Sequence, residues 1–223
     1  MKSLKYILKF YVIYNGELIN LDIEVIFIRH GETDYNKELR YQGHMDIDLN
    51  EKGYTQAQKV SERMSSEEIG EIYSSNLKRA QNTAELIAGP HDLKVKKRSG
   101  LREINMGDWE GSTYDDLKKE YPDLFKKWYN NPIEVRPPGG ETLVEFRNRV
   151  IDSFEEIINN CEQERIVITA HGGTIRVVLA HLLDIPLNKN WRIQVHNTSV
   201  SRVKLYSEYP PAVKLVNSTY HLD

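Results

Sequence analysis

The stretch Ile26-Phe27-Ile28-Arg29-His30-Gly31-Glu32-Thr33 decides the fold class of this chain. An apolar run typical of a buried strand stops there at an arginine, a histidine and a glycine. Open α/β sheets bind their ligands beyond the carboxyl ends of the strands, so polar residues at such a point indicate a site. The same arrangement returns downstream, where the mostly apolar segment 165–170 ends in His171-Gly172-Gly173-Thr174. We therefore expect two imidazoles, those of His30 and His171, to face one site.

Strand-like and helix-like segments alternate along the remainder of the sequence. The clearest helix covers residues 142–159, where apolar residues recur with the helical period and Thr142 and Glu145 have the spacing of a capping box. The alternation predicts an α/β fold, a three-layer α/β/α sandwich with a mostly parallel central sheet. The expected strands are 24–28, 71–74, 93–97, 165–170, 200–206 and 212–216, and the expected helices are 51–65, 77–87, 114–120, 122–130, 142–159 and 174–183.

The composition narrows the class of partner. A formal net charge of −3 disfavours a nucleic-acid partner, because nucleic-acid surfaces need a concentrated basic face. We interpret the short basic run 94–98 as a solvated strand face. The single cysteine, Cys161, excludes an internal disulfide and indicates a reducing compartment, so we expect a cytoplasmic protein.

Residues 1–22 form an N-terminal extension whose role the sequence leaves unknown. The longest uncharged run, 10–16, is too short to span a bilayer, so we expect no membrane partner. A peripheral membrane contact is the alternative, but no cationic amphipathic face accompanies the run. Alternation around Tyr6, Leu8 and Phe10 predicts an extra edge strand or hairpin.

Further motifs follow the opening stretch in a fixed order. They are Gln42-Gly43 with residues 48–53, a block with Arg79 at 74–84, a loop with Glu103 at 101–111, Gly139-Gly140-Glu141-Thr142, and residues 171–174. Together with Arg29-His30-Gly31-Glu32-Thr33 they resemble the histidine phosphatase superfamily, also called the phosphoglycerate mutase-like family. The resemblance runs from about residue 23 to the end, which predicts one histidine phosphatase domain at 23–223. Within it, residues 111–139 resemble the insertion that caps the substrate in this family.

The chemistry of a phosphate monoester gives the two arginines a role. The dianion needs concentrated positive charge and many donors, and a guanidinium supplies a planar fork that stays charged. We expect Arg29 and Arg79 to bind the phosphate, Arg79 at a helix start where backbone N–H groups also favour anions. The alternatives are a strand-end salt bridge for Arg29 and an exposed helix position for Arg79.

His30 is the expected nucleophile. A neutral imidazole can attack phosphorus and leave as a phosphoramidate, which divides hydrolysis into two easier steps. The turn at Gly31 allows a nearby backbone carbonyl to accept the other ring proton and to fix the tautomer. His171 is expected to donate to the phosphate, in a cationic form that two phosphate oxygens favour. Metal ligation by the two histidines is the alternative. Without a carboxylate or cysteine complement they make an incomplete set, so we expect no metal and no cofactor.

Hydrolysis also needs an acid for the leaving alkoxide and a base for water, and the resemblance implies Glu103 for both. A neighbouring phosphate dianion favours the protonated carboxyl that the first step requires. The rivals are Glu110 and Asp108 in the same loop and Glu32 beside the nucleophile.

The motif flanks supply the remaining candidate residues. We expect the phosphate cradle to be completed by Asn36, Gln42, Gly43 and the backbone of Gly172. Two other residues near these motifs are assigned elsewhere, Trp109 to the core and His44 to the surface rather than to the substrate.

Mutases and phosphatases of this superfamily share such machinery. Mutases that resemble the chain carry a longer insert after the acid glutamate, rich in arginine and tyrosine. Here only 68 residues separate Glu103 from His171, and Arg136 is the lone arginine of 111–139. We therefore expect a metal-independent phosphomonoesterase with a phosphohistidine intermediate, acting on a small phosphorylated metabolite, with α-ribazole 5'-phosphate as one candidate.

Two alternatives stay open. One is a cofactor-dependent phosphoglycerate mutase. The other is an inactive phospho-ligand-binding or scaffold protein of the same fold, which would be expected to have lost one of the site residues. The sequence leaves a homodimer possible and does not fix the oligomeric state.

Overall fold

The computed structural model describes residues 11–14, 17–20 and 22–223. Among them, six strands form the central sheet in the order β5-β4-β6-β3-β7-β8. β5, β4, β6 and β3 are parallel, whereas β7 and β8 run antiparallel to their neighbours. The expected mostly parallel sheet is thereby confirmed. The strand bounds are Ile23–Arg29 for β3, Glu71–Ser75 for β4, Val95–Arg98 for β5, Arg165–Ala170 for β6, Val200–Leu205 for β7 and Ala212–Ser218 for β8.

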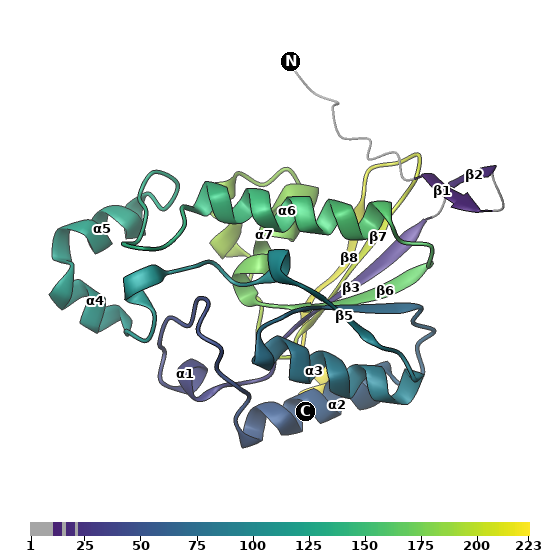
Figure 1. Cartoon of the computed structure of the whole chain (residues 1–223), viewed down its shortest axis with the longest axis horizontal. Coiled ribbons are helices and arrows are strands. Elements are labelled where there is room, and N and C mark those ends of the chain that lie inside the picture. The colour runs from purple at the N-terminus through teal and green to yellow at the C-terminus, as the bar shows by residue number, and fades with distance from the viewer. Residues whose placement is uncertain (1–10, 15–16, 21) are drawn as a thin grey trace, which may run out of the picture.

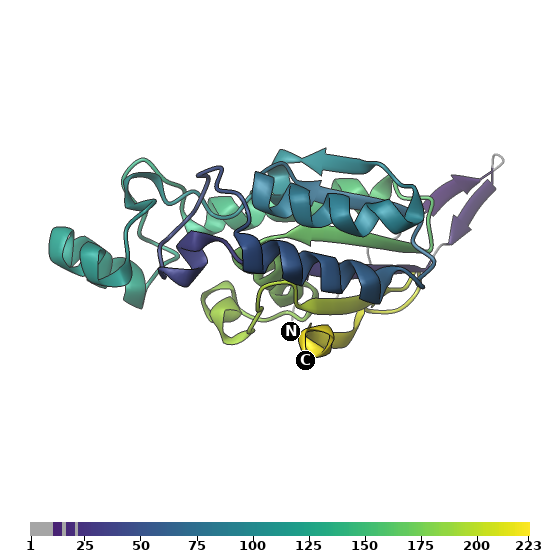
Figure 2. The same ribbon diagram turned by 90° about the horizontal axis from the view of Figure 1, so that it is seen from below.

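Helices cover both faces of this sheet, as Figures 1 and 2 show. Strand β3 is buried on both sides, which explains the continuous apolar run of residues 25–28. Successive side chains of a strand point to opposite faces. Val25 and Phe27 pack into the cluster that contains the apolar face of α6, whereas Ile26 and Ile28 pack with α2 and α3. The bounds are Glu51–Met64 for α2, Lys78–Ala88 for α3, Leu143–Asn159 for α6 and Gly172–Leu182 for α7.

The register brings three strand ends to one level. Arg29 at the end of β3 pairs with Ala170 at the end of β6, and Ser74 of β4 pairs with Thr169 of β6. The residues that follow these strands, including His30 and His171, therefore meet at the carboxyl edge of the sheet. Helix α7 begins at Gly172 rather than at the expected residue 174, so His171 is its N-cap.

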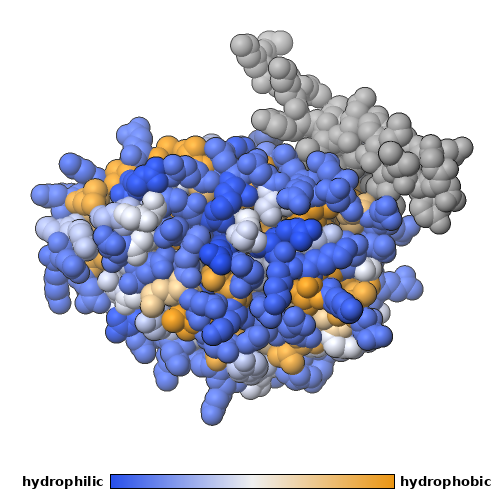
Figure 3. Space-filling view, in the orientation of Figure 1, coloured by the Kyte–Doolittle hydropathy of each residue, from blue (hydrophilic) through white to orange (hydrophobic). Residues whose placement is uncertain are grey.

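The loop with Glu103, residues 101–111, is called the acid loop below. The segment between this loop and α6 forms two short helices, α4 (Tyr114–Glu120) and α5 (Pro122–Asn130). They lie at the carboxyl end of the sheet, on the left of Figure 1. A separate apolar cluster holds them to the acid loop through Trp109, Leu117 and Phe125, and Trp109 is fully buried as expected. The surrounding surface is mostly hydrophilic with scattered apolar residues (Figure 3).

The remaining elements are short. Helix α1 (Asp34–Lys37) follows the first motif, and 3₁₀ turns occupy Gly89–His91, Ser99–Leu101, Gly107–Trp109, Leu187–Arg192 and Tyr220–Leu222. Strands β1 (Tyr11–Tyr14) and β2 (Glu17–Asn20) form a separate two-stranded hairpin. The alternation around Tyr6, Leu8 and Phe10 lies outside the described residues. Within the described ranges, no helix combines the length and apolar character needed to cross a bilayer.

Candidate active site

His30 and His171 lie side by side at the carboxyl edge of the sheet, as their two strand ends require. Their ring centroids are 5.2 Å apart, and both side chains are buried. The chain turns at Gly31, whose added Cβ would stand 2.4 Å from the carbonyl oxygen of Gly53 in α2. Only a residue without a side chain permits this close approach, so glycine here sets the direction of the chain after His30.

The imidazole of His30 is held in one tautomer. Its Nδ1 lies 2.7 Å from the carbonyl oxygen of Gly31, which can only accept, so Nδ1 carries the proton and Nε2 keeps its lone pair. Burial, together with the charges of Arg79 and Arg29, holds the pKa of His30 well below its usual value. The group is therefore a neutral imidazole at pH 7, as a nucleophile must be.

Two guanidinium groups flank this histidine, that of Arg79 buried and that of Arg29 partly buried. Arg79, in the first turn of α3, donates to the carbonyl oxygens of Met45 (2.7 Å) and Gly43 (2.8 Å). Arg29 donates to the carbonyl oxygen of Val195 (2.8 Å), and its buried Nε has no partner. Burial lowers the pKa of each arginine to about 10. Among the described residues neither forms an ion pair with a carboxylate, so both charges are available to an anionic ligand.

His171 joins the second arginine to strand β4. The Nε of Arg79 donates to Nδ1 of His171 (3.3 Å), so the Nε2–H of His171 donates to Oγ of Ser75 (2.8 Å). Burial, and next the charge of Arg79, keep the pKa of His171 well below its usual value. His171 is therefore neutral in this arrangement, and the cationic form expected for it would need a bound phosphate to stabilise it.

Two helices begin at the same place. The N-caps of α3 and α7 are Leu77 and His171, and neither side chain caps its helix. Carboxylates accept from the first turn of both helices instead: the backbone N–H of Lys78 donates to Oδ1 of Asp46 (2.7 Å), and that of Gly173 donates to Oε2 of Glu103 (2.9 Å), so both helix starts favour an anionic group.

Glu103 reaches the site from the acid loop. Its Oε2 accepts from the backbone N–H of Gly173 (2.9 Å), and its Oε1 accepts from that of Ile104 (2.9 Å). Gly173 permits this contact, since a Cβ there would stand 2.2 Å from Oε1 of Glu103. The carboxylate therefore lies against the start of α7, one residue beyond Gly172.

The rival acids have other contacts. Glu110 Oε1 accepts from the backbone N–H groups of His44 (2.8 Å) and Met106 (3.1 Å) and so braces the loop. Glu32 accepts from Lys52 (2.7 Å), and that bond lowers the pKa of its carboxyl. Asp108 is exposed.

The residues expected to complete the phosphate cradle differ in how directly they contact the two arginines. Gly43, at φ +49°, contacts Arg79 through its carbonyl oxygen, and Gly172 packs against the guanidinium of Arg29. Gln42 is buried with its Oε1 unpartnered. Asn36 instead completes the capping box of α1 with Thr33, so its link to the site is indirect.

Sequence reasoning missed two polar contacts of this site. Asn197 donates to the carbonyl oxygen of His30 (2.9 Å) and to Oδ1 of Asn36 (3.2 Å). Ser75 accepts from His171, and the only signal for it was a serine pair at the end of an apolar strand. His44 also differs from the surface position expected, because it is half-buried with Nε2 2.9 Å from the carbonyl oxygen of Glu103.

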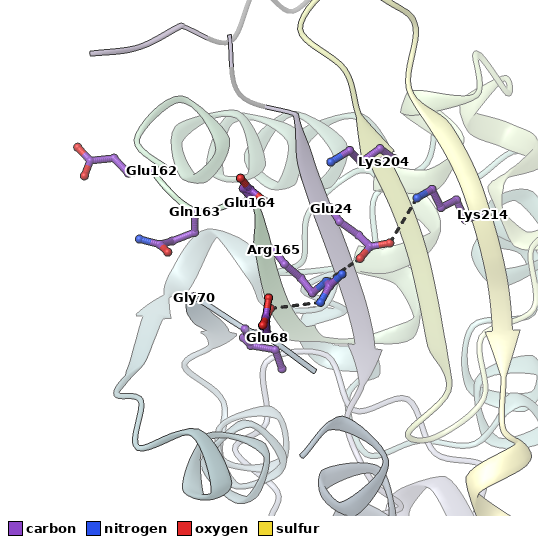
Figure 4. A pocket seen from close by; sticks show the side chains of 10 residues that line it. Glu24, Glu68, Gly70, Glu162, Gln163, Glu164, Arg165, Lys204 and Lys214 are labelled. Carbon is purple, nitrogen blue, oxygen red and sulfur yellow. Dashed lines mark hydrogen bonds and ion pairs between the residues drawn. The ribbon is translucent and has the colours of Figure 1, made fainter. Parts of the chain in front are cut away.

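A hollow of about 590 Å³ lies at the opposite, amino end of β3 and β6. Figure 4 shows its charged lining, in which Arg165 pairs with Glu24 (2.7 Å). It contains none of the expected site residues, and we do not assign the chemistry to it. Over the ranges that the structure describes, no three His, Cys, Asp or Glu side chains gather in the manner of a metal site.

Known proteins share this architecture and sequence. The pattern of the histidine phosphatase superfamily (branch 1) matches residues 25–219. Phosphoserine phosphatase 1 of Hydrogenobacter thermophilus is 34% identical over 200 residues, 90% of this chain and 94% of that protein. Phosphoglycerate mutase-like protein 4 of Arabidopsis thaliana is 36% identical over 203 residues, 90% of this chain and 87% of that protein.

Solved structures agree. The alpha-ribazole phosphatase of Shigella flexneri superposes with a TM-score of 0.83 at 27% identity, covering 88% of this chain and 97% of that one. A phosphoserine phosphatase of Entamoeba histolytica in complex with 3-phosphoglyceric acid gives 0.79 at 30% identity, covering 90% and 100%. These matches confirm the phosphomonoesterase class, and the chain belongs to the histidine phosphatase superfamily.

Proposed function

We propose that this enzyme hydrolyses a small phosphorylated metabolite through a phosphohistidine formed on His30. The observation that carries the proposal is the single tautomer of His30, with Nδ1 bonded to Gly31 and Nε2 free. This imidazole lies between two arginines that have no carboxylate counter-ion among the described residues. A lone pair on Nε2 and a cationic surround are what attack on a phosphate dianion requires.

The proposed reaction has two steps. In the first, Nε2 of His30 forms a bond to phosphorus while the bond to the leaving oxygen breaks, and Glu103 gives that oxygen a proton. In the second, Glu103 takes a proton from water, the water oxygen bonds to phosphorus, and the bond to Nε2 breaks. Arg29, Arg79 and the phosphate-stabilised cation of His171 balance the charge on the transferring group in both steps.

We propose residues 111–139 as a substrate cap of the phosphatase kind. Its lone arginine, Arg136, donates to Glu145 (2.6 Å) and to the carbonyl oxygen of Gly140 (3.0 Å). It is therefore engaged outside the site rather than offered to a substrate carboxylate, which favours hydrolysis over the mutase alternative. The names of the relatives make phosphoserine and α-ribazole 5'-phosphate the first substrates to test.

The phosphoenzyme tests the proposal directly. The chain is mixed with a ³²P-labelled phosphomonoester and quenched in base, and the labelled protein is then exposed to acid. We expect acid-labile label that His30→Ala cannot form and that His196→Ala, a change at an exposed histidine, still forms. Label retained by His30→Ala, or found on a serine, would contradict the mechanism.

A second experiment separates hydrolase from mutase. Phosphate release is measured from an aryl phosphate, phosphoserine, 3-phosphoglycerate and α-ribazole 5'-phosphate, with and without 2,3-bisphosphoglycerate and a chelator. We expect release without primer and no effect of the chelator. Dependence on the primer would support the mutase, dependence on a divalent metal would revive ligation by the two histidines, and no turnover would support the scaffold alternative.

A homodimer and a cytoplasmic location stay predictions, to be tested by sedimentation and fractionation.

A further inference from the structure

Arg149 of α6 donates hydrogen bonds to the main chain of the acid loop. The Nη1 of Arg149 donates to the carbonyl oxygens of Gly100 (3.0 Å) and Arg102 (3.2 Å), and its Nη2 donates to that of Glu103 (3.2 Å). Three carbonyl groups within four residues are thus fixed by a single planar side chain. A lysine has the charge but not the rigid fork needed to reach them together.

Glu141 holds this arginine in place. Its Oε2 accepts from Nε of Arg149 (3.3 Å), and its Oε1 pairs with Nη2. The same Oε1 accepts from the backbone N–H of Asn105 (2.8 Å), and the backbone N–H of Glu141 donates to the carbonyl oxygen of Asn105 (3.0 Å). Because both side chains are largely buried, with 26% and 15% of their surfaces exposed, the pair is fixed rather than mobile.

Glu103 is consequently held at both of its ends. Its carbonyl oxygen accepts from Arg149 and from Nε2 of His44 (2.9 Å), while its carboxylate accepts from the backbone of Gly173 and Ile104. The main chain fixes where the side chain starts, and the N-terminus of α7 fixes where it ends.

We infer that Arg149, with Glu141 as its counter-ion, is a positioning residue that aims the carboxylate of Glu103 at the leaving oxygen. This inference rests on the proposed function, since it requires Glu103 to act as the acid. Arg149 donates to the carbonyl oxygens of the acid loop and to Glu141, so its effect passes through the main chain of that loop. A displacement of about 1 Å at a catalytic group can cost about 100-fold in rate.

The test compares two leaving groups in single turnovers. An alkoxide needs a proton to depart, whereas p-nitrophenolate does not, so the ratio of the two rates reports the acid alone. In Arg149→Met we expect the rate with an alkyl phosphate to fall about 10- to 100-fold and the rate with p-nitrophenyl phosphate by less than about threefold. Arg149→Lys should fall between Arg149→Met and the wild type. The ratio of the two rates does not depend on the fraction of enzyme that is folded, because both substrates are assayed with the same enzyme preparation.

Arg147→Met is the matched control on the same helix. Arg147 donates to Asn148 and His181 rather than to the acid loop, so the ratio should stay at the wild-type value. In a Glu103→Gln background, Arg149→Met should change the alkyl rate by less than about threefold, because the group it positions is already gone.

Equal losses for the two leaving groups in Arg149→Met, or a full additional loss in the Glu103→Gln background, would overturn the inference and leave the proposed function standing. If Glu103→Gln alone fails to discriminate the leaving groups, the assignment of the acid is wrong and the inference falls with it. Discrimination by Glu103→Gln and Arg149→Met but not by Arg147→Met is the result that supports it.

Discussion

The substitution Gly173→Ala would displace the carboxylate of Glu103 with a single methyl group and leave the backbone in place. The added Cβ would stand 2.2 Å from Oε1 and 3.2 Å from Oε2 of Glu103, whereas ordinary contact begins at 3.4 Å. The carboxylate must therefore move by about 1.2 Å, the difference between 3.4 and 2.2 Å, and its bond to the N–H of Gly173 would be lost or lengthened. The obstructing atoms are the end of a flexible side chain, so the backbone need not yield.

We expect stability and activity to respond in opposite directions. Alanine is a better helix residue than glycine by about 0.5–1 kcal/mol, so the free energy of unfolding should hold or rise slightly. The first turnover of an alkyl phosphate should slow by about 100-fold, because the acid is displaced by about 1 Å. With p-nitrophenyl phosphate the loss should be much smaller, since that leaving group needs little protonation.

The assay combines urea unfolding with quenched-flow single turnovers on both substrates. Gly89→Ala is the control, because a Cβ at that position meets nothing within 4 Å. An alkyl rate for Gly173→Ala within about threefold of the wild type would refute the reasoning that Glu103 acts from its position against α7. Equal losses on both substrates would place the damage at the phosphate site instead.

Two further predictions concern the histidines. Ser75→Ala removes the acceptor of the Nε2–H of His171 and leaves a buried donor unsatisfied, so the free energy of unfolding in urea should fall by about 1–3 kcal/mol; no change would mean that the bond is not formed. Burial lowers the pKa of His30 and His171 in the folded state, whereas in the unfolded chain each has the ordinary histidine pKa of about 6.5. Below that pH the unfolded chain therefore binds more protons than the folded one. The stability that the neutral histidines contribute is present above about pH 6.5 and is lost as the pH falls below it. Urea unfolding at pH 7.5 and 5.5 should show this fall, and it should be smaller in His30→Gln; stability that rises on acidification would contradict it.

The central sheet could be predicted from the sequence because its strands carry their own signal. β3 and β6 are covered by helices on both faces, so their sequences are mostly apolar and turn polar where the strands end. Their parallel pairing then places His30 beside His171 without any further information. The strand expected at 93–97 forms at Val95–Arg98 instead, after Asp92 adopts a left-handed conformation that ends the preceding turn.

The supporting residues could not be found in this way, because their partners are distant in the chain. Ser75 lies 96 residues from His171, Asn197 lies 167 from His30 and Arg149 lies 46 from Glu103. Nothing in the helical period of α6 distinguishes Arg149 from Arg147, although only the first turns toward the acid loop. A single polar side chain at the border of an apolar face shows its role only once the facing loop is in place.

The two arginines of the site are an unfavourable arrangement of charge. Within the part of the chain that the structure describes, the guanidinium groups of Arg29 and Arg79 form no ion pair with a carboxylate, and burial is the largest of the effects that set the pKa of each at about 10. The neighbouring carbonyl oxygens of Met45, Gly43 and Val195 fix their orientation but leave their charge uncompensated. Under the proposed function, a dianion that enters this site would offset these positive charges and would favour protonation of His171, which would add a third cationic donor. The affinity for phosphate would then come from the same two arginines, neither of which forms an ion pair with a carboxylate among the described residues.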